Sequence, residues 1–312
     1  MLFFLKAILS PSFDRVTYSP WEWAVMRSLF AFFALVPATP LNLSFRAQPQ
    51  PTGVAQFVDI TWITIGPVQE LITFAFFAFL ALYLVGFFPL TATIGLFVIH
   101  TLTGTLVNSQ GAIHHNTQLI GLVLLGQILA HIYWRLKPNL ALQRNPRLSA
   151  DPLTPATLLI YHSQQLIAAG YVASGISKLI NSRGEWISQI PNIPIQFEKN
   201  FAYRYYDHLE PPAQEASEGM IHFIAENPAA AQVLFGFGLF LEALCFLALM
   251  NRATLALWGL ALWIMHHTIS SVMGLGFAFN KAILLIFFIN LPFWLFLAAT
   301  QGHRYLQSKS AS

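Results

Sequence analysis

The stretch LLIYHSQQLIAAGYVASGISKLI, residues 158–180, decides the fold class, because it is long enough to cross a bilayer and yet carries a charged side chain, Lys178. A helix needs about 20 predominantly apolar residues to cross a hydrocarbon core of roughly 30 Å. A charge at that depth costs roughly 2.5 to 3.5 kcal/mol on insertion scales, so such a group usually faces a cavity or a partner. The stretch therefore predicts a transmembrane helix with polar chemistry near one end.

The whole chain has the same apolar character. Of its 312 residues, 56% are hydrophobic and only 9% are charged, and the mean hydropathy is +0.58, far above what a soluble domain needs for its core. Short connections after the second and sixth apolar runs predict antiparallel hairpins. We therefore expect an all-α, polytopic transmembrane helix bundle, forming a single domain over residues 1–312. About eight runs are long enough to cross: 21–39, 69–89, 91–108, 117–134, 156–180, 229–250, 253–273 and 278–299.

Two segments outside these runs have features of their own. Residues 1–20 begin with an apolar stretch that is too short to span and lacks a small-residue cleavage site, so we expect an interfacial N-terminal segment. The longest loop, 181–228, is acidic and is expected outside. Within it, PPAQEASEGMIHFIAEN (211–227) predicts a short amphipathic helix, because Met220, Ile221 and Ile224 share one face.

The distribution of basic residues predicts the orientation, because cytoplasmic loops carry the excess of Lys and Arg. With the N-terminus inside, nine basic residues flank the inner ends: Lys6, Arg15, Arg135, Lys137, Arg144, Arg147, Arg252, Arg304 and Lys309. Four lie outside: Arg46, Arg183, Lys199 and Arg204. We expect both termini in the cytoplasm of a multi-pass protein, and the bacterial inner membrane as its location.

The same features argue against several other classes of function. The net charge of +3 is spread over membrane-flanking loops and forms no basic patch, so we expect the lipid bilayer, and no nucleic acid, as a partner. Cys245 is the one cysteine, which excludes an intramolecular disulfide and a CxxC motif. The sequence has no P-loop, GxGxxG or GxSxG motif.

Ionisable residues inside the apolar runs predict a site. The expected crossing directions place Lys178, His266 and Lys281 in the outer half of the bundle and Glu242 near mid-depth, with His114 and His115 in an outer turn. A carboxylate that faces an ammonium group offsets part of the cost of burial. Desolvation lowers the pKa of a buried lysine, which lets a lysine act as a base, and an imidazole nearby can relay the proton.

Each of these residues also has a plainer interpretation. Lys178 and Lys281 lie near helix ends and could extend to the interface. Glu242 has no polar neighbour in its own segment, which favours a pair with another helix. His266 and His267 point about 100° apart on a helix, so at most one faces a shared cavity. His100 and His114 are candidate axial ligands of a haem or chlorophyll, although no second helix carries a matching pair.

The segment AAGYVASGISKL, followed by Trp186, resembles the HTTM (horizontally transferred transmembrane) family and the membrane part of vitamin K-dependent γ-carboxylase. Lys178 falls on the lysine that serves the carboxylase as its base. Further similar segments follow in the family's order: WAVMRSLFAFFALV with Arg27, HHNTQLIGLVLL with His115 or Asn116, FLEALCFL with Glu242, and IMHHTISSVMGLGFAF with His266 and Gly276.

The resemblance implies a membrane enzyme in which Lys178 is the base and His266 and Glu242 orient groups or relay protons. The other residues expected at the substrate are His114, His115, Asn116, Trp186 and Lys281. The implied substrate is lipid-soluble and quinone-like, with haem or chlorophyll the less favoured cofactors. Ser177 replaces the first lysine of the family's Lys-Lys pair, so carboxylation of protein glutamates is not expected.

A different class of function remains open. The chain has 28 phenylalanines and eight tryptophans, which suit packing against lipid, pigment or partner helices. The alternative is therefore a non-catalytic, cofactor-binding subunit of a larger membrane complex, with other membrane subunits as partners. A transporter is the least favoured class, because no internal repeat is visible.

Overall fold

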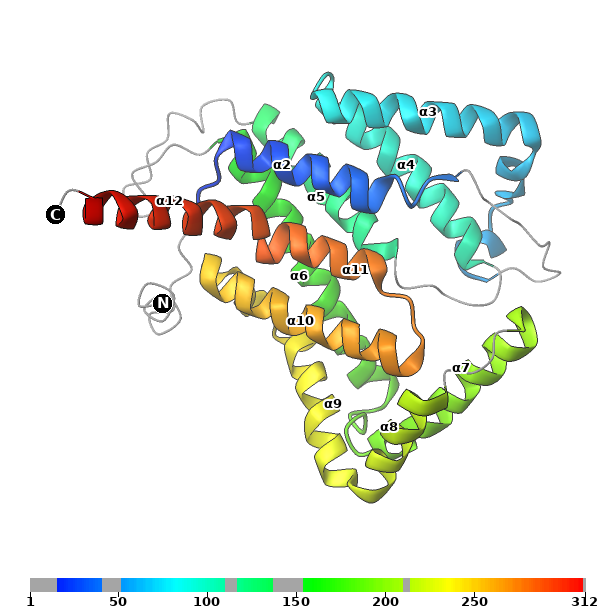
Figure 1. Ribbon diagram of the computed structural model, residues 1–312. Helices are drawn as coiled ribbons and strands as arrows, with labels where there is room; N and C mark the ends of the chain where they lie inside the picture. Colours follow the sequence, from blue (N-terminus) through cyan, green and yellow to red (C-terminus); the bar gives the residue numbers. More distant parts are fainter. Residues whose placement is uncertain (1–15, 41–51, 110–116, 137–153, 210–213, 311–312) are drawn as a thin grey trace.

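The computed structural model describes residues 16–40, 52–109, 117–136, 154–209 and 214–310, and within these segments it is all-helical with no β-strand (Figure 1). The all-α prediction is therefore confirmed. The α-helices are α2 (Pro20–Phe30), α3 (Gly66–Val85), α4 (Pro89–Asn108), α5 (Gln118–Leu136), α6 (Pro155–Asn181), α7 (Ile193–His208), α8 (Gln214–Glu226), α9 (Pro228–Ala243), α10 (Arg252–Met273), α11 (Ala278–Ile283) and α12 (Leu291–Ser310). The π-helices are η1 (Ala31–Leu35) and η9 (Leu284–Ile289), and the 3₁₀ helices are η3 (Gly53–Gln56), η4 (Thr61–Thr64), η7 (Ile190–Asn192) and η8 (Cys245–Met250).

By length and composition, α3, α4, α5 and α10 could each cross a membrane. Two bent pairs raise the count among the described residues to six if each pair is one span: α8 with α9, bent by 112°, and α11–η9 with α12, bent by 42°. The predicted count of eight is not confirmed. The run 21–39 forms only α2 and η1, which end at Leu35, and the run 229–250 is divided where α9 ends at Ala243.

The central helix α6 has 27 residues, but it carries a polar group, HSQQ at 162–165, that lowers its apolar character. The buried Gln164 amide has hydrogen-bond partners outside α6: its Nε2 donates to the Phe287 carbonyl at 2.8 Å and to the Tyr18 hydroxyl at 2.9 Å. The Ser163 hydroxyl donates to the Leu159 carbonyl at 2.8 Å. Gln164 therefore ties α6 to neighbouring segments, whereas the Ser163 hydroxyl is bonded within α6.

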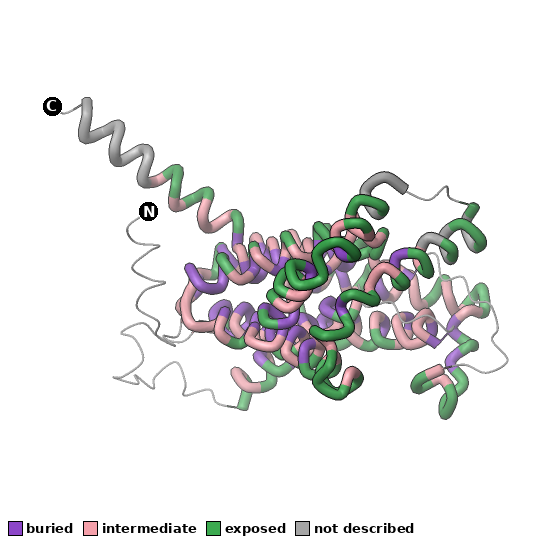
Figure 2. Tube along the Cα trace, turned by 90° about the horizontal axis from the view of Figure 1, so that it is seen from below, coloured by how far each residue is buried: buried purple, intermediate pink, exposed green. Residues whose placement is uncertain are grey.

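Helix α6 packs against α5, α9, η8 and α2, and so holds the middle of the bundle (Figure 1). Two glycines allow the close approaches. A Cβ on Gly126 of α5 would lie 2.7 Å from the His162 carbonyl oxygen, and a Cβ on Gly175 of α6 would lie 2.9 Å from the Ala243 nitrogen. Figure 2 shows the buried residues along the middle of the bundle and the exposed ones on its outside.

The hairpin of α3 and α4 confirms one predicted short connection. Gly86 ends α3 in the left-handed conformation, with φ of 79°, and Pro89 opens α4, where a missing N–H costs nothing. Helix α3 is apolar around most of its surface but largely exposed, with Phe74 at 73% and Val85 at 79%. Such outward apolar surface suits lipid, so the apolar helices indicate a multi-pass integral membrane protein.

The segment after α6 folds into two helices, of which the sequence predicted one. Helix α8 ends at Glu226, before Asn227 and Pro228, as expected for the amphipathic helix within 211–227. Helix α7 was not predicted. The pair packs against α9 and the end of α10 through a small separate core that includes Ile190, Phe197, Ile224 and Ala231.

Candidate functional site

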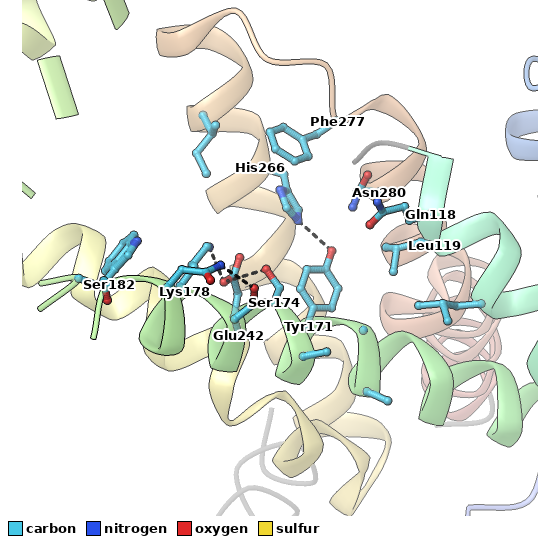
Figure 3. A pocket seen from close by; sticks show the side chains of 18 of the residues that line it. Gln118, Leu119, Tyr171, Ser174, Lys178, Ser182, Glu242, His266, Phe277 and Asn280 are labelled. Carbon is cyan, nitrogen blue, oxygen red and sulfur yellow. Dashed lines mark hydrogen bonds and ion pairs between the residues drawn. The ribbon is translucent and has the colours of Figure 1, made fainter. Parts of the chain in front are cut away.

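Lys178 and Glu242 form an ion pair between α6 and the end of α9. Lys178 Nζ lies 2.5 Å from Glu242 Oε2, and the Ser174 hydroxyl donates to the same oxygen at 3.5 Å (Figure 3). The Glu242 side chain is 6% exposed and that of Lys178 is 35% exposed. Lys178 is thus turned towards a buried carboxylate, and the expected partner of Glu242 on another helix is Lys178.

The backbone explains why these two side chains meet. Gly175 lies one turn before Lys178, and its missing Cβ lets α6 approach the backbone of Ala243, the residue after Glu242. On the other side, the Trp258 indole N–H donates to the Leu241 carbonyl at 2.9 Å, which fixes the end of α9 against α10. Two features therefore position the ion pair: the close contact of Gly175 with Ala243, and the hydrogen bond from Trp258 that holds the end of α9.

A second polar group lies two turns earlier on the same face of α6. The Tyr171 hydroxyl lies 2.8 Å from His266 Nε2, and the Phe277 ring stacks on the imidazole with centroids 4.5 Å apart. The Asn280 side chain interacts with the same hydroxyl. His266 is 4% exposed, whereas His267 is exposed and stacks on Trp263, so only one of the two histidines faces this group, as predicted.

Both groups face one cavity of about 1080 Å³, here called the polar cavity, between α5, α6, α9, α10 and α11. Figure 3 shows Lys178, Ser174 and Glu242 together at one end, Tyr171 pointing to His266, and Asn280 and Gln118 farther along. Six buried side-chain atoms of the described residues have no hydrogen-bond partner, and two of them, His266 Nδ1 and Asn280 Oδ1, belong to residues that line the polar cavity. Buried polar atoms are rarely left unpaired, so these two are candidates for contact with a ligand.

The structure brings together four of the eight residues predicted for the site. Lys178, Glu242, His266 and Trp186 line the polar cavity, and the Trp186 ring centre lies 5.6 Å from Lys178 Nζ. Lys281 is not among the residues that line it. His114, His115 and Asn116 lie outside the described residues.

Sequence reasoning missed Tyr171, Ser174, Asn280 and Gln118, which also line the polar cavity. A signal for two of them was present. Tyr171, Ser174 and Lys178 follow the spacing i, i+3, i+7 and therefore share a helix face. Asn280 directly precedes Lys281 in an otherwise apolar run, where the charged residue drew attention instead.

A second buried ion pair, also missed, joins Glu22 of α2 to Arg252 of α10. Arg252 donates to both carboxylate oxygens at 2.7 and 3.2 Å, and Asn290 Nδ2 and the Ser19 N–H donate at 3.1 and 2.9 Å. The guanidinium lies between the Tyr18 and Phe293 rings, and burial raises the pKa of Tyr18 to about 12. Only about 10 Å³ of free space adjoins this pair.

Two further predictions concern metal and haem ligation. The part of the chain that the structure describes contains no group of three or more His, Cys, Asp or Glu side chains placed to hold a metal ion. The ring of His100, one of the two candidate haem ligands, has Nε2 3.0 Å from the Thr117 carbonyl oxygen. The other candidate, His114, is outside the described residues.

No protein-family model, curated protein or solved structure matches the chain. The resemblance to the HTTM family therefore stays a prediction.

Proposed function

We propose that this integral membrane protein is an enzyme, similar to the HTTM family and the membrane part of vitamin K-dependent γ-carboxylase, that removes a proton from a lipid-soluble, quinone-like substrate. The observation that carries the proposal is the Lys178–Glu242 pair, whose buried carboxylate and partly exposed ammonium line a cavity of about 1080 Å³. Ligand cavities are usually about 300 to 1,000 Å³, with mostly apolar walls and a few convergent polar groups. The polar cavity has this character.

The pair can supply a base, and it gains one proton, that of the substrate, in doing so. Lys178 Nζ lies 2.5 Å from Glu242 Oε2, so a proton can pass from the ammonium to the carboxylate and leave a neutral amine. The amine then takes the proton of a substrate O–H. The products are a substrate anion, an ammonium on Lys178 and a neutral carboxylic acid on Glu242. General-base catalysis requires the Lys178 amine to lie within hydrogen-bond reach, about 2.6 to 3.2 Å, of the substrate oxygen whose proton it takes.

His266 belongs to the second polar group of the cavity, apart from the Lys178–Glu242 pair. In the tautomer in which the Tyr171 hydroxyl donates to His266 Nε2, the other ring nitrogen, Nδ1, carries hydrogen. His266 Nδ1 then offers a donor, and Asn280 Oδ1 offers an acceptor. A flat, quinone-like substrate with an oxygen at each end suits this cavity, because one oxygen can meet Lys178 while the other meets His266 and Asn280.

The test follows oxidation of a reduced naphthoquinone by dioxygen, because the quinol anion reacts faster than the neutral quinol. The purified protein in lipid nanodiscs should accelerate the appearance of quinone absorbance. Lys178→Met should lower this acceleration at least about 100-fold, the usual contribution of a positioned base. Lys281→Met is the matched control, because Lys281 does not line the polar cavity, and it should keep the activity. Unchanged rates in both variants would end the proposal.

The alternative function, a non-catalytic subunit of a membrane complex, predicts different behaviour on purification. Other chains should then remain bound through the outward apolar faces, such as that of α3, or a visible absorption band should accompany the protein. An isolated, colourless and active chain favours the enzyme.

A further inference from the structure

Arg27, in the last turn of α2, is a charged residue for which the polar cavity gives no role. Its side chain forms no ion pair and no hydrogen bond with another described residue, and its Nε is buried without a partner. A guanidinium group does not lose its proton in proteins, so the charge persists. A buried charge without a partner is costly, which favours a ligand that brings the negative charge.

A glycine makes room for this guanidinium. Gly86 ends α3 in the left-handed conformation, with φ of 79°. A Cβ on Gly86 would lie 2.7 Å from Arg27 Nη1 and 3.6 Å from Nη2, so the guanidinium lies directly against the turn between α3 and α4 (Figure 1). Arg27 is only partly buried, and a ligand can therefore reach it from the surface of the bundle.

The groups near Arg27 offer hydrogen-bond donors. Arg27 is close enough to Tyr83 to interact with it electrostatically, and the Tyr83 hydroxyl donates to Gln127 Oε1 at 3.0 Å. Gln127 is 0% exposed, and its Nε2 is a second buried donor without a partner. Helix α4 begins at Pro89, three residues after Gly86, and a helix N-terminus has unpaired N–H groups and a partial positive charge. Such a set of donors favours an anion with several acceptor oxygens.

The turn between α3 and α4 indicates the depth of Arg27 in the membrane. Both helices are long and apolar enough to cross, so the turn that joins them lies at one surface of the bilayer. Phe87 and Phe88, directly after Gly86, are 57% and 62% exposed, which suits contact with lipid tails. The guanidinium therefore lies where the tails end and the head groups begin.

We propose that Arg27 and the start of α4 bind the phosphate group of a membrane phospholipid, at the bilayer surface where α3 ends. A guanidinium can donate two parallel N–H groups to two oxygens of one phosphate, which an ammonium group cannot do. The helix N-terminus adds further N–H donors for the remaining oxygens. The site is separate from the polar cavity and does not depend on the proposed function.

The experiment titrates the purified full chain in detergent with lipids and counts the bound molecules by native mass spectrometry. The probes are dioleoylphosphatidylglycerol and dioleoylglycerol, which has the same two chains and no phosphate. The variant is Arg27→Gln. Arg135→Gln is the matched control, because Arg135 is an exposed arginine in the last turn of α5.

Arg27→Gln should weaken the tightest phosphatidylglycerol binding at least about tenfold, the lower end for the loss of a charge-assisted hydrogen bond, and leave dioleoylglycerol binding unchanged. Arg135→Gln should weaken phosphatidylglycerol binding by less than about fivefold, the effect of any cation near anionic lipid. Equal losses in the two variants, or equal losses for the two lipids, would overturn the proposal. Inorganic phosphate in excess should not displace the lipid, and displacement would show that the site takes the free anion instead.

A second measurement covers the folding of the variant. Phosphatidylglycerol should raise the unfolding temperature of the wild type and of Arg135→Gln by mass action, and should raise that of Arg27→Gln less. An equal rise in all three proteins would contradict the site. If Arg27→Gln does not fold, Arg27→Lys replaces it, because lysine keeps the charge but cannot offer two parallel N–H groups. Arg27→Lys should also weaken phosphatidylglycerol binding, and unchanged binding would overturn the proposal.

Discussion

The molecule contains two ion pairs built on a buried carboxylate, and they differ in what surrounds them. Glu22 accepts hydrogen bonds from Arg252, Asn290 and Ser19, and the arginine is covered on both faces by aromatic rings. Glu242 accepts from Lys178 and Ser174, next to a cavity of about 1080 Å³. Protein groups surround the Glu22–Arg252 pair, here called the closed pair. The Lys178–Glu242 pair adjoins free space that a ligand can occupy and is here called the open pair. A buried charge marks a functional site when its surroundings are incomplete.

The largest expected effect comes from breaking the closed pair. Arg252→Met would leave the Glu22 carboxylate buried without its cation and should lower the free energy of unfolding by about 3 to 5 kcal/mol. Lys178→Met should cost only about 1 to 2 kcal/mol, because Glu242 lines the polar cavity of about 1080 Å³, from which water can reach the carboxylate, whereas only about 10 Å³ adjoins the Arg252 pair. Thermal unfolding in detergent compares them. A larger loss for Lys178→Met would reverse the assignment of the two pairs.

The next effect concerns the helix contact that creates the open pair. Gly175→Ala places a methyl group against the backbone of Ala243, so α6 and α9 must separate, at a cost of about 1 to 3 kcal/mol. Gly170→Ala on the same helix is the control, because its Cβ would meet only the flexible ends of the Leu122 and Leu119 side chains. Equal unfolding temperatures for the two variants would show that the contact at Gly175 is not tight.

The smallest effect should come from Tyr171→Phe, which removes one hydrogen bond to His266 and should cost about 0.5 to 1.5 kcal/mol of stability. A positioning role predicts more than this loss. The variant should slow the oxidation of a reduced naphthoquinone and change the ¹⁵N shift of His266 Nε2, while Lys178 and Glu242 remain coupled. An unchanged imidazole spectrum and rate would limit Tyr171 to packing.

The sequence was sufficient for the helical class and for the charged members of the site, because Lys178, Glu242 and His266 stand out in apolar runs. It was not sufficient for the number of spans. The run 229–250 looks continuous, yet α9 ends at Ala243 and η8 follows, with no proline or glycine at the break. The closed pair was missed because its partners are 230 positions apart and Arg252 already had an explanation as an orientation signal.

Uncharged polar residues explain most of what remained hidden at the site. Tyr171 and Asn280 gain their significance from the cavity they share, and only tertiary structure shows this. The closing contact at Gly175 could not be predicted either, since small residues are common wherever membrane helices approach one another.

The most direct test of the central claim, that Lys178 and Glu242 act as one pair, is a double-mutant cycle. The free energy of unfolding is measured in detergent for Lys178→Met, Glu242→Gln, the double variant and the wild type. Residues in contact usually show coupling of about 0.5 to 3 kcal/mol, and independent ones add within about 0.3 to 0.5 kcal/mol. The account predicts coupling of at least about 1 kcal/mol, and additive losses would contradict it.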